Sequence, residues 1–229
     1  YKHVPIVEEN ILQSSINNII GTHYLTEASI KYEVETFVLI SSDKAVRPTN
    51  FMGASKRIAE LILQINSTYS HSTKFAIVRF GNVLGSSGSV VPLFKKQIDH
   101  GGPILITHKD IIRYFMTQQE AAQLVIQAGS MSKKCSIFVL DMGKSVKIYD
   151  LAQKMILLAG KTIKNKSNPS GEVEIKEIGL RKGEKLFEEI SLNNNLKKTK
   201  HPLILQSVEE NYHVDNINKS LEKIYKYIY

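Results

Sequence analysis

The segment around residues 36–44 constrains the fold of this chain most. Residues 36–41 (TFVLIS) are mainly apolar and rich in β-forming residues, which predicts a buried strand, and the polar Ser42 and Asp43 mark its carboxyl end. Further buried strands are predicted at 75–80 and 136–141, and helices at 51–69, 93–100, 117–128 and 145–158. Because strands and helices alternate, we predict an α/β fold with a parallel sheet.

The helix after the first strand places further side chains near the strand's end. Its predicted apolar stripe consists of Ile58, Leu61, Ile62 and Ile65. Met52 and Lys56 are four residues apart and share a face, and we expect both to point toward the end of the strand. Reactions in open α/β sheets take place at the carboxyl ends of strands. The sequence thus predicts a site made of Ser42, Asp43, Lys44, Met52 and Lys56.

The rest of the chain continues the alternation. Ser145 is expected to cap the helix 145–158, which ends near Gly160. Residues 161–171 are predicted to form a loop before a strand at 172–178. Asp215 is expected to cap a final helix that packs on the core through Ile217, Leu221, Ile224 and Ile228.

Several segments together resemble a known family. They are SSDKAVRPTNFMGASKRIAE, RFGNVLGSSGSVVPLFKKQI, THKDIIRYFMT and GLRKGEKLFEE, and the resemblance runs from Lys2 to about Pro202. They are similar to the membrane-anchored UDP-N-acetylglucosamine 4,6-dehydratases, which are extended short-chain dehydrogenase/reductases. Most short-chain dehydrogenase/reductases have a tyrosine four residues before the helix lysine, and Met52 stands at that position here.

The resemblance implies a partial Rossmann-like parallel sheet with a small α/β substrate-binding lobe. Residues 1–84 and 111–141 would belong to the NAD-binding domain, 85–110 and 142–202 to the lobe, and 203–229 to a helical end. The family's glycine-rich cofactor loop precedes the matched region, so we expect a carboxy-terminal portion of a longer protein. That protein is expected to form homo-oligomers and to be anchored at the cytoplasmic face of a bacterial inner membrane by the absent amino-terminal region.

The resemblance also implies a reaction. Such an enzyme transfers a hydride from sugar C4 to NAD, eliminates water across C5 and C6, and returns the hydride to C6. Asp43 would protonate O6, Lys44 would take the C5 proton, and Ser42 would hydrogen-bond O4. A free lysine has a pKa of about 10.4, so Lys44 must be partly desolvated to act as a base. The alternative is that Asp43 and Lys44 form an ordinary solvated pair.

Met52 leaves one proton transfer unassigned. A thioether cannot accept the proton of the C4 hydroxyl. Asp43, Lys44 and a bound water are the candidates, and an inactive reductase is the alternative.

Further site residues follow from the resemblance. Lys2, His3, Val4 and Lys56 would lie at the nicotinamide ribose, and Asn18 would order the active-site helix. Asn82 would contact the diphosphate, Val91 and Pro92 would border the uracil, and Arg113, Arg181 and Glu184 would lie beside the UDP group. The alternatives are surface positions for His3 and Asn18 and surface ion pairs for the arginines.

The glycines of residues 81–88 have the spacing of a dinucleotide-binding loop. We reject that interpretation, because Pro92 and residues 101–103 interrupt the helix and strand that should follow such a loop.

Composition limits the other possibilities. The 229-residue chain has one cysteine, which excludes an internal disulfide, and its seven histidines lack metal-ligand spacing, so we expect no metal. No apolar run approaches the roughly 20 residues of a membrane span. The net charge of +8 comes from dispersed lysines without interleaved aromatics, which favours solvated loops over nucleic-acid binding. The chain itself is expected to be cytoplasmic.

We therefore expect an NAD-dependent lyase that converts UDP-N-acetylglucosamine to a UDP-4-keto-6-deoxy sugar for polysaccharide or glycan biosynthesis. Retention or inversion at C5 stays open. Alternatives are an NAD-dependent epimerase or reductase on the same scaffold and a non-catalytic UDP-sugar-binding module.

Overall fold

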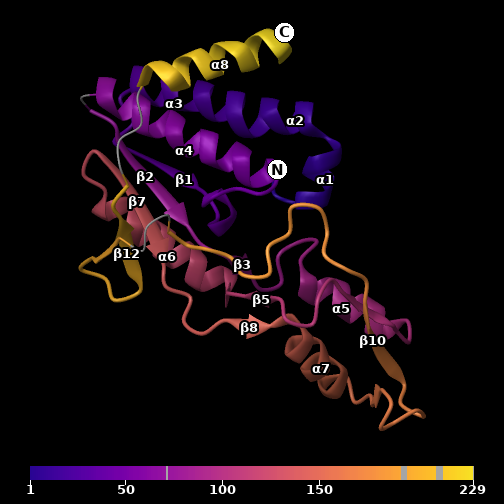
Figure 1. Ribbon diagram of the computed structural model, residues 1–229. Coiled ribbons are helices and arrows are strands. Elements are labelled where there is room, and N and C mark those ends of the chain that lie inside the picture. Colours follow the sequence, from indigo (N-terminus) through magenta and orange to yellow (C-terminus); the bar gives the residue numbers. More distant parts are fainter. Residues whose placement is uncertain (71, 192–194, 210–213, 229) are drawn as a thin grey trace. The chain divides into compact units, whose positions relative to one another are not determined.

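The computed structural model describes residues 1–70, 72–191, 195–209 and 214–228 (Figure 1). These residues divide into two compact units. The first unit contains 1–80, 122–141 and 189–229, and the second contains 81–121 and 142–188.

A mixed sheet forms the centre of the first unit. Within the described residues its order is β1-β2-β7-β12-β11. The strands are β1 (Thr36–Ile40), β2 (Lys74–Arg79), β7 (Cys135–Leu140), β12 (Ile204–Ser207) and β11 (Leu196–Lys198). The first three are parallel, as predicted, whereas β12 is antiparallel to β7 and to β11. The α/β class with a Rossmann-like sheet is confirmed, and the antiparallel pair at one edge was not predicted.

Helices cover this sheet. They are α1 (Val4–Glu9), α2 (Ile11–Ser15), a π-helix (Ile16–Ile20), α3 (Gly21–Lys31), α4 (Phe51–Tyr69), α6 (Gln118–Met131) and α8 (Val214–Ile228). Figure 1 shows α3 and α4 layered along β1 and β2. Side chains alternate along a strand, so Leu39, Phe75 and Ile77 pack on Ala59 and Leu63 of α4. The opposite face carries Val38, whose Cγ2 lies near Gly129 of α6.

Two residues of the predicted stripe of α4, Ile58 and Ile62, pack against other helices. Ile62 packs with Ile19 and with Leu221 of α8, and Ile58 lies against this cluster. Ala59 and Leu63, which were not part of the predicted stripe, face the sheet instead. Leu221 and its neighbour Ile224 therefore pack on the core, as expected. The side chains of Asp215, Ile217 and Ile228, with the predicted cap, lie outside the described residues.

The second unit is built around a short parallel sheet of order β4-β10-β9. Its strands are β4 (Ile104–Ile106), β10 (Val173–Glu177) and β9 (Ile163–Lys164), and its helices are α5 (Val90–Asp99) and α7 (Ile148–Leu158). Phe94 and Ile98 of α5 and Ile156 of α7 share one core with Ile104 and Val173. Two short strand pairs complete the unit: β3 (Asn82–Val83) with β6 (Phe115–Met116), and β5 (Ile112–Arg113) with β8 (Val146–Lys147).

Strand pairing explains where the local predictions were wrong. The helix predicted from Ser145 begins only at Ile148, because Val146 and Lys147 pair with β5, and its N-cap Lys147 makes no side-chain cap bond. The expected loop 161–171 contains β9, which pairs with β10.

The bounds of the units differ from the expected domains for the same reason. Pairing of β3 with β6, and of β5 with β8, holds residues 81–84 and 111–121 in the second unit. Pairing of β12 with β7, and of β11 with β12, holds residues 196–207 in the first unit.

No helix among the described residues is long and apolar enough to cross a membrane. No group of three or more His, Cys, Asp or Glu side chains there is placed to hold a metal ion.

Candidate active site

The backbone after β1 is fixed by the neighbouring strand. Ser41 N donates to Val78 O at 2.9 Å, and Asp43 N donates to Phe80 O at 3.1 Å. A 3₁₀ turn over Asp43–Ala45 follows, and Ser42 Oγ accepts from Lys44 N at 3.2 Å. The pairing of β1 with β2 thus extends beyond both strands and sets the position of Asp43.

The carboxylate of Asp43 is buried and only partly bonded. The residue is 1% exposed, and its Oδ1 accepts from Ser42 Oγ at 2.9 Å and from Lys44 Nζ at 3.0 Å. Oδ2 is also buried, and it has no hydrogen-bond partner among the described residues. The side chain of Lys44 is 17% exposed. The alternative of an ordinary solvated pair is therefore wrong, because water does not surround these charges.

The first turn of α4 lies directly on the turn that carries Lys44. A Cβ added at Gly53 would be 2.2 Å from Lys44 O and 3.2 Å from Pro48 Cβ. Asn50 Oδ1 caps the helix by accepting from Gly53 N at 2.9 Å, and Glu8 of α1 accepts from Phe51 N. Only glycine fits at position 53, a requirement that the sequence did not reveal.

Lys56 points to the end of β1, as predicted. Its Nζ donates to Ile40 O at 3.2 Å. Burial lowers the pKa of the Lys56 ammonium, and the negative charge of Glu60 opposes this effect. Met52 is 3% exposed and lies within the core. The helix therefore supplies a partly desolvated cation beside the carboxyl end of the strand.

The amino-terminal residues contact α4 through Asn18. Its Nδ2 donates to Ser55 Oγ at 3.0 Å and to Tyr1 O at 2.9 Å. Asn18 is 5% exposed, so the alternative of a surface amide is wrong. Lys2 is exposed, whereas His3 and Val4 are half-buried at the start of α1. Their roles at a cofactor stay predictions.

A cluster of buried charges was missed by the sequence reasoning. Arg57 and Glu60 of α4, Arg79 at the end of β2, and Glu209 form what we call the buried ion network. Arg79 Nε and Nη2 donate to the two oxygens of Glu60 at 2.7 and 2.6 Å. Arg79 Nη1 donates to Glu209 Oε1 at 2.5 Å. The available signal was Arg79 itself, a cation inside the apolar run FAIVRF.

In the second unit, Arg113 is bonded to its own protein. The residue is 7% exposed, and its guanidinium donates to Ile112 O at 2.8 Å, Leu186 O at 3.2 Å and Lys185 O at 2.8 Å. Glu184 Oε1 lies 3.5 Å from Nη2. The alternative that Arg113 forms a surface ion pair is wrong, because its guanidinium group is buried.

Glu184 connects the other parts of this region. It accepts from Thr107 Oγ1 at 3.1 Å and from Arg181 N at 3.1 Å. The side chain of Arg181 is exposed, and so is Pro92, which lies with Val91 in the first turn of α5. Asn82 lies in β3 and its backbone N donates to Tyr114 O at 3.0 Å. The structure thus brings Arg113, Glu184 and the Arg181 backbone together.

The glycine-rich segment 81–88 lacks the surroundings of a dinucleotide loop. Gly85 and Gly88 adopt φ values of 70° and 66°, and α5 follows. The next strand, β4, ends at Ile106 and is followed by Thr107 rather than by an acidic residue. These features agree with the rejection of a cofactor loop here.

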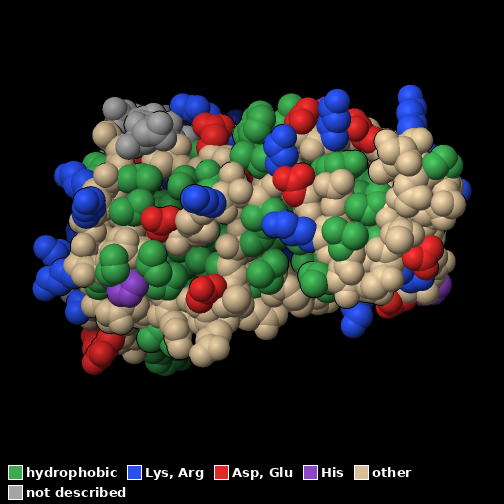
Figure 2. Space-filling model, turned by 90° about the horizontal axis from the view of Figure 1, so that it is seen from below, with side chains coloured by type: hydrophobic (Ala, Val, Ile, Leu, Met, Phe, Trp, Pro, Cys, Tyr) green, Lys and Arg blue, Asp and Glu red, His purple; other side chains and the backbone are tan. Residues whose placement is uncertain are grey.

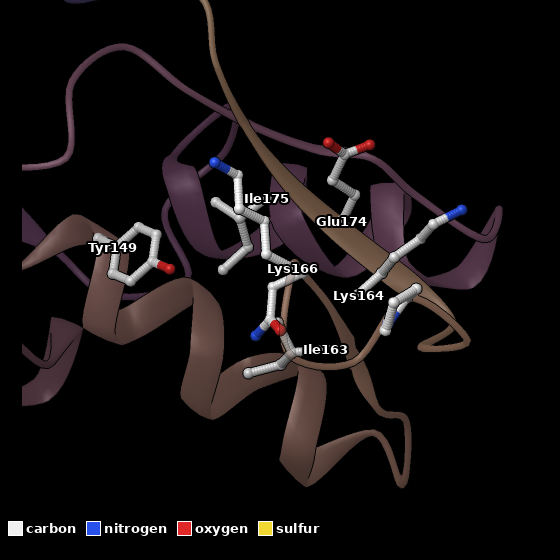
Figure 3. Close-up of a pocket in the computed structure, with 8 residues that line it drawn as sticks. Tyr149, Ile163, Lys164, Lys166, Glu174 and Ile175 are labelled. Atoms are coloured by element: carbon white, nitrogen blue, oxygen red, sulfur yellow. The ribbon is translucent and has the colours of Figure 1, made fainter.

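A surface pocket of the second unit contains none of the predicted site residues. Figure 3 shows it beside α7 and β10, with Tyr149, Ile163, Lys164, Lys166, Glu174 and Ile175 among its lining residues. The pocket has a volume of about 440 Å³. On the face shown in Figure 2, basic side chains are interspersed with acidic and apolar ones.

Comparison with known proteins places this geometry in a family. Residues 1–209 match the family model described as polysaccharide biosynthesis protein. The chain is 54% identical over 195 residues to the probable polysaccharide biosynthesis protein EpsC of Bacillus subtilis. The aligned region covers 85% of this chain and 31% of EpsC. It is 33% identical to a UDP-N-acetylglucosamine 4,6-dehydratase (inverting) of Campylobacter jejuni, over 82% of this chain and 52% of that protein. It is also 33% identical to a UDP-glucose 4-epimerase of Rickettsia canadensis, over 86% of this chain and 55% of that protein. The chain thus spans about a third to about half of these relatives.

Solved structures give the same fold. The X-ray structure of Pen from Bacillus thuringiensis superposes with a TM-score of 0.79 at 30% identity, over 99% of this chain and 72% of Pen. The UDP-glucose 4-epimerase of Thermus thermophilus, solved as a complex with NAD, superposes with a TM-score of 0.70 at 20% identity, over 83% of this chain and 66% of that one. Since the family model covers most of the sequence, the chain belongs to the polysaccharide biosynthesis protein family, within the extended short-chain dehydrogenase/reductases.

Proposed function

We propose that this chain carries the acid and base of a nucleotide-sugar 4,6-dehydratase that acts on UDP-N-acetylglucosamine. The observation that supports this most is the buried pair of Asp43 and Lys44, joined at 3.0 Å. The 33% identity to a protein named for that reaction adds to it. The protein would supply a UDP-4-keto-6-deoxy sugar to polysaccharide biosynthesis.

The hydrogen bond between the two side chains suits an elimination. Passage of one proton from Nζ to Oδ1 converts the ion pair into a carboxylic acid and a neutral amine. The amine of Lys44 then takes the C5 proton, the C5–H electrons form the C5–C6 double bond, and the C6–O6 bond breaks. Asp43 protonates O6, which leaves as water. This step returns the carboxylate and the ammonium, so the pair is restored to the ionised form.

The residues present fit the nicotinamide end of NAD. Lys56 offers a partly desolvated ammonium at the strand end, and the buried Asp43 Oδ2 has no partner among the described residues. When bound, NAD would supply the hydride acceptor for the C4 hydrogen and the hydride that is later returned to the sugar. Lys56 would hold the ribose, with Lys2, His3 and Val4 beside it, and Asn18 would hold α4 in place through Ser55. The C4 hydroxyl proton would pass to Asp43, Lys44 or water, since Met52 cannot take it.

The second unit would bind the UDP group. Arg181 is exposed, and its guanidinium group suits phosphate oxygens. Arg113 would add positive charge, although its guanidinium group already donates to the backbone carbonyls of Ile112 and Lys185. Asn82, Val91 and Pro92 would complete this part, and Glu184 would position the Arg181 turn. Membrane attachment and self-association of the full-length protein are further parts of the proposal.

Isotope exchange and mass test the reaction. The intact enzyme, incubated with UDP-N-acetylglucosamine in heavy water, is expected to yield a product that has lost one water and carries solvent deuterium at C5. Lys44→Ala should abolish this product while UDP binding survives. Undiminished turnover of the variant would contradict the role of Lys44 as base.

A second candidate is a 4-epimerase, because a relative with that name is equally similar at 33% identity. An epimerase would oxidise C4 but release no water, so a product of unchanged mass would favour it. Binding of UDP by the intact protein without any affinity for NAD would instead favour a non-catalytic sugar-nucleotide module.

A further inference from the structure

Three residues on one face of α4 meet the chain that follows β1. Gly53, Lys56 and Glu60 are three and four positions apart, which is the spacing of neighbours on a helical face. Lys44 O closely approaches Gly53, and Lys56 Nζ donates to Ile40 O at 3.2 Å. This face of α4 therefore lies against the backbone that leads to the proposed acid and base.

Ser41 makes the third contact, with Glu60. Its Oγ donates to Glu60 Oε1 at 2.6 Å, and the residue is 5% exposed. Side chains alternate along a strand, so Ser41 continues the face of Leu39, which packs on α4. An apolar side chain is expected at such a buried position. The structure instead has a hydroxyl there, bonded to a charged group of the helix.

Glu60 is an acceptor with a defined position. Arg79 Nε also donates to Oε1, at 2.7 Å, and Arg79 Nη2 and Arg57 Nη1 donate to Oε2 at 2.6 and 2.8 Å. A bidentate arginine–carboxylate pair fixes both distance and orientation. An ionised carboxylate has about four lone-pair positions, and the two arginines and Ser41 occupy them. The hydroxyl is thus bonded to a carboxylate that its other partners hold in place.

This bond restrains a direction that the strand pairing leaves open. Ser41 N donates to Val78 O at 2.9 Å, and Asp43 N donates to Phe80 O at 3.1 Å. These two bonds hold the backbone beside the neighbouring strand, but they set no distance between that backbone and α4. The hydroxyl of Ser41 does so, two residues before Asp43.

We propose that Ser41 is a positioning residue, which sets the Asp43–Lys44 turn relative to α4 through its bond to Glu60. The consequence for catalysis rests on the proposed function, in which Asp43 and Lys44 are the acid and base. Ser41 does not itself react. Loss of its hydroxyl should slow the chemical step and leave the sugar nucleotide bound, because the second unit would hold the UDP group.

Turnover of Ser41→Ala tests this role. Since a misplacement of about 1 Å can cost about 100-fold in rate, kcat of the intact enzyme is expected to fall at least about tenfold, with KM for the sugar nucleotide nearly unchanged. Ser132→Ala is the matched control. Ser132 is also 5% exposed, and its Oγ donates at 2.6 Å to Phe75 O, at the opposite end of β2. Its kcat should stay at the wild-type value.

Two further variants separate the hydrogen bond from the space that the side chain fills. Ser41→Thr keeps the hydroxyl and should retain most of the turnover. Ser41→Cys is close to serine in size but donates only weakly, so it should behave like Ser41→Ala, and it replaces that variant if alanine prevents folding. Wild-type turnover of Ser41→Cys, or a loss in Ser41→Thr equal to that in Ser41→Ala, would overturn the proposal.

Hydrogen exchange measures the positioning without any assay of activity. The amides of residues 43, 45 and 46 donate to backbone carbonyls, and peptide mass spectrometry of the intact protein reports their exchange. Local loosening in Ser41→Ala should speed this exchange at least about tenfold, whereas Ser132→Ala should match the wild type. Equal exchange in the two variants would overturn the proposal. The expected difference in a protein that dehydrates no UDP-sugar would support it and reject the proposed function alone.

Discussion

Replacing Gly53 with alanine tests whether the contact between α4 and the Lys44 turn is needed for activity. The new Cβ would stand 2.2 Å from Lys44 O and 3.0 Å from Lys44 C. Ordinary contact begins at about 3.4 Å, so one backbone must move by roughly 1 Å. A displacement of about 1 Å at catalytic groups can reduce the rate by about 100-fold. We therefore expect kcat of Gly53→Ala to fall about 100-fold, with UDP binding retained by the second unit.

The stability of this variant should change much less than its activity. Overpacking costs about 1–3 kcal/mol, whereas alanine is favoured over glycine in a helix by about 1 kcal/mol. Gly129→Ala in α6 is the matched control, because its Cβ would meet only Val38 Cγ2, at 2.9 Å, at the end of a side chain. Turnover and thermal unfolding of both variants are compared in the intact enzyme. Wild-type turnover of Gly53→Ala would show that the close approach does not matter.

Two further predictions concern stability and reactivity. Thr117→Ala should lower the free energy of unfolding by about 1 kcal/mol at neutral pH, measured by denaturant titration, because Thr117 Oγ1 accepts from Glu120 N at 3.2 Å. The backbone N–H and the hydroxyl of Thr117 both donate to the Glu120 carboxylate and hold its pKa below the ordinary 4.5. Alanine keeps the N–H, so only the share of the loss that comes from the hydroxyl–carboxylate bond should be present above that pH and disappear as the pH falls through the lowered value. An equal loss at acidic and neutral pH would refute the second point. Burial raises the pKa of the Cys135 thiol from 9.0 to about 11. Because the thiolate is the reactive form, iodoacetamide should label Cys135 roughly 100-fold more slowly in the native protein than in the unfolded protein at pH 8. Equal labelling rates would refute this prediction.

Elements with a clear hydrophobic periodicity could be predicted from the sequence. Elements that depend on pairing between strands far apart in the sequence could not. The apolar run before Ser42 and the spacing of α4 sufficed to place β1, α4 and the direction of Lys56. Ser145 fits the pattern of a helix cap, but a strand pair of the second unit takes the residues that follow it. No local pattern indicates that two residues after a turn will meet a strand more than thirty positions away, since Arg113 pairs with Val146.

The same limit applies within the site. Arg57 and Glu60 stand three apart, a spacing that usually marks an exposed helical ion pair, and their burial depends on Arg79 and Glu209 from other parts of the chain. The close approach at Gly53 depends on the path of residues 44–48, where Arg47 adopts a φ of 43°. Sequence reasoning reached the proposed catalytic groups and Asn18, which bonds to Ser55 of α4, but not the buried ion network or the close approach at Gly53.

The methionine at position 52 gives these supporting contacts their importance. Without a tyrosine hydroxyl at position 52, every proton in the proposed reaction must be handled by Asp43, Lys44 or water. Asp43 and Lys44 are adjacent on one short turn, so a shift of that turn would move the proposed acid and base together. The turn is held by the bond from Asp43 N to Phe80 O, by the contact of Lys44 O with Gly53, and by Ser41 through Glu60. A site that places its acid and base in consecutive residues therefore depends on its backbone contacts more than one that draws them from separate elements.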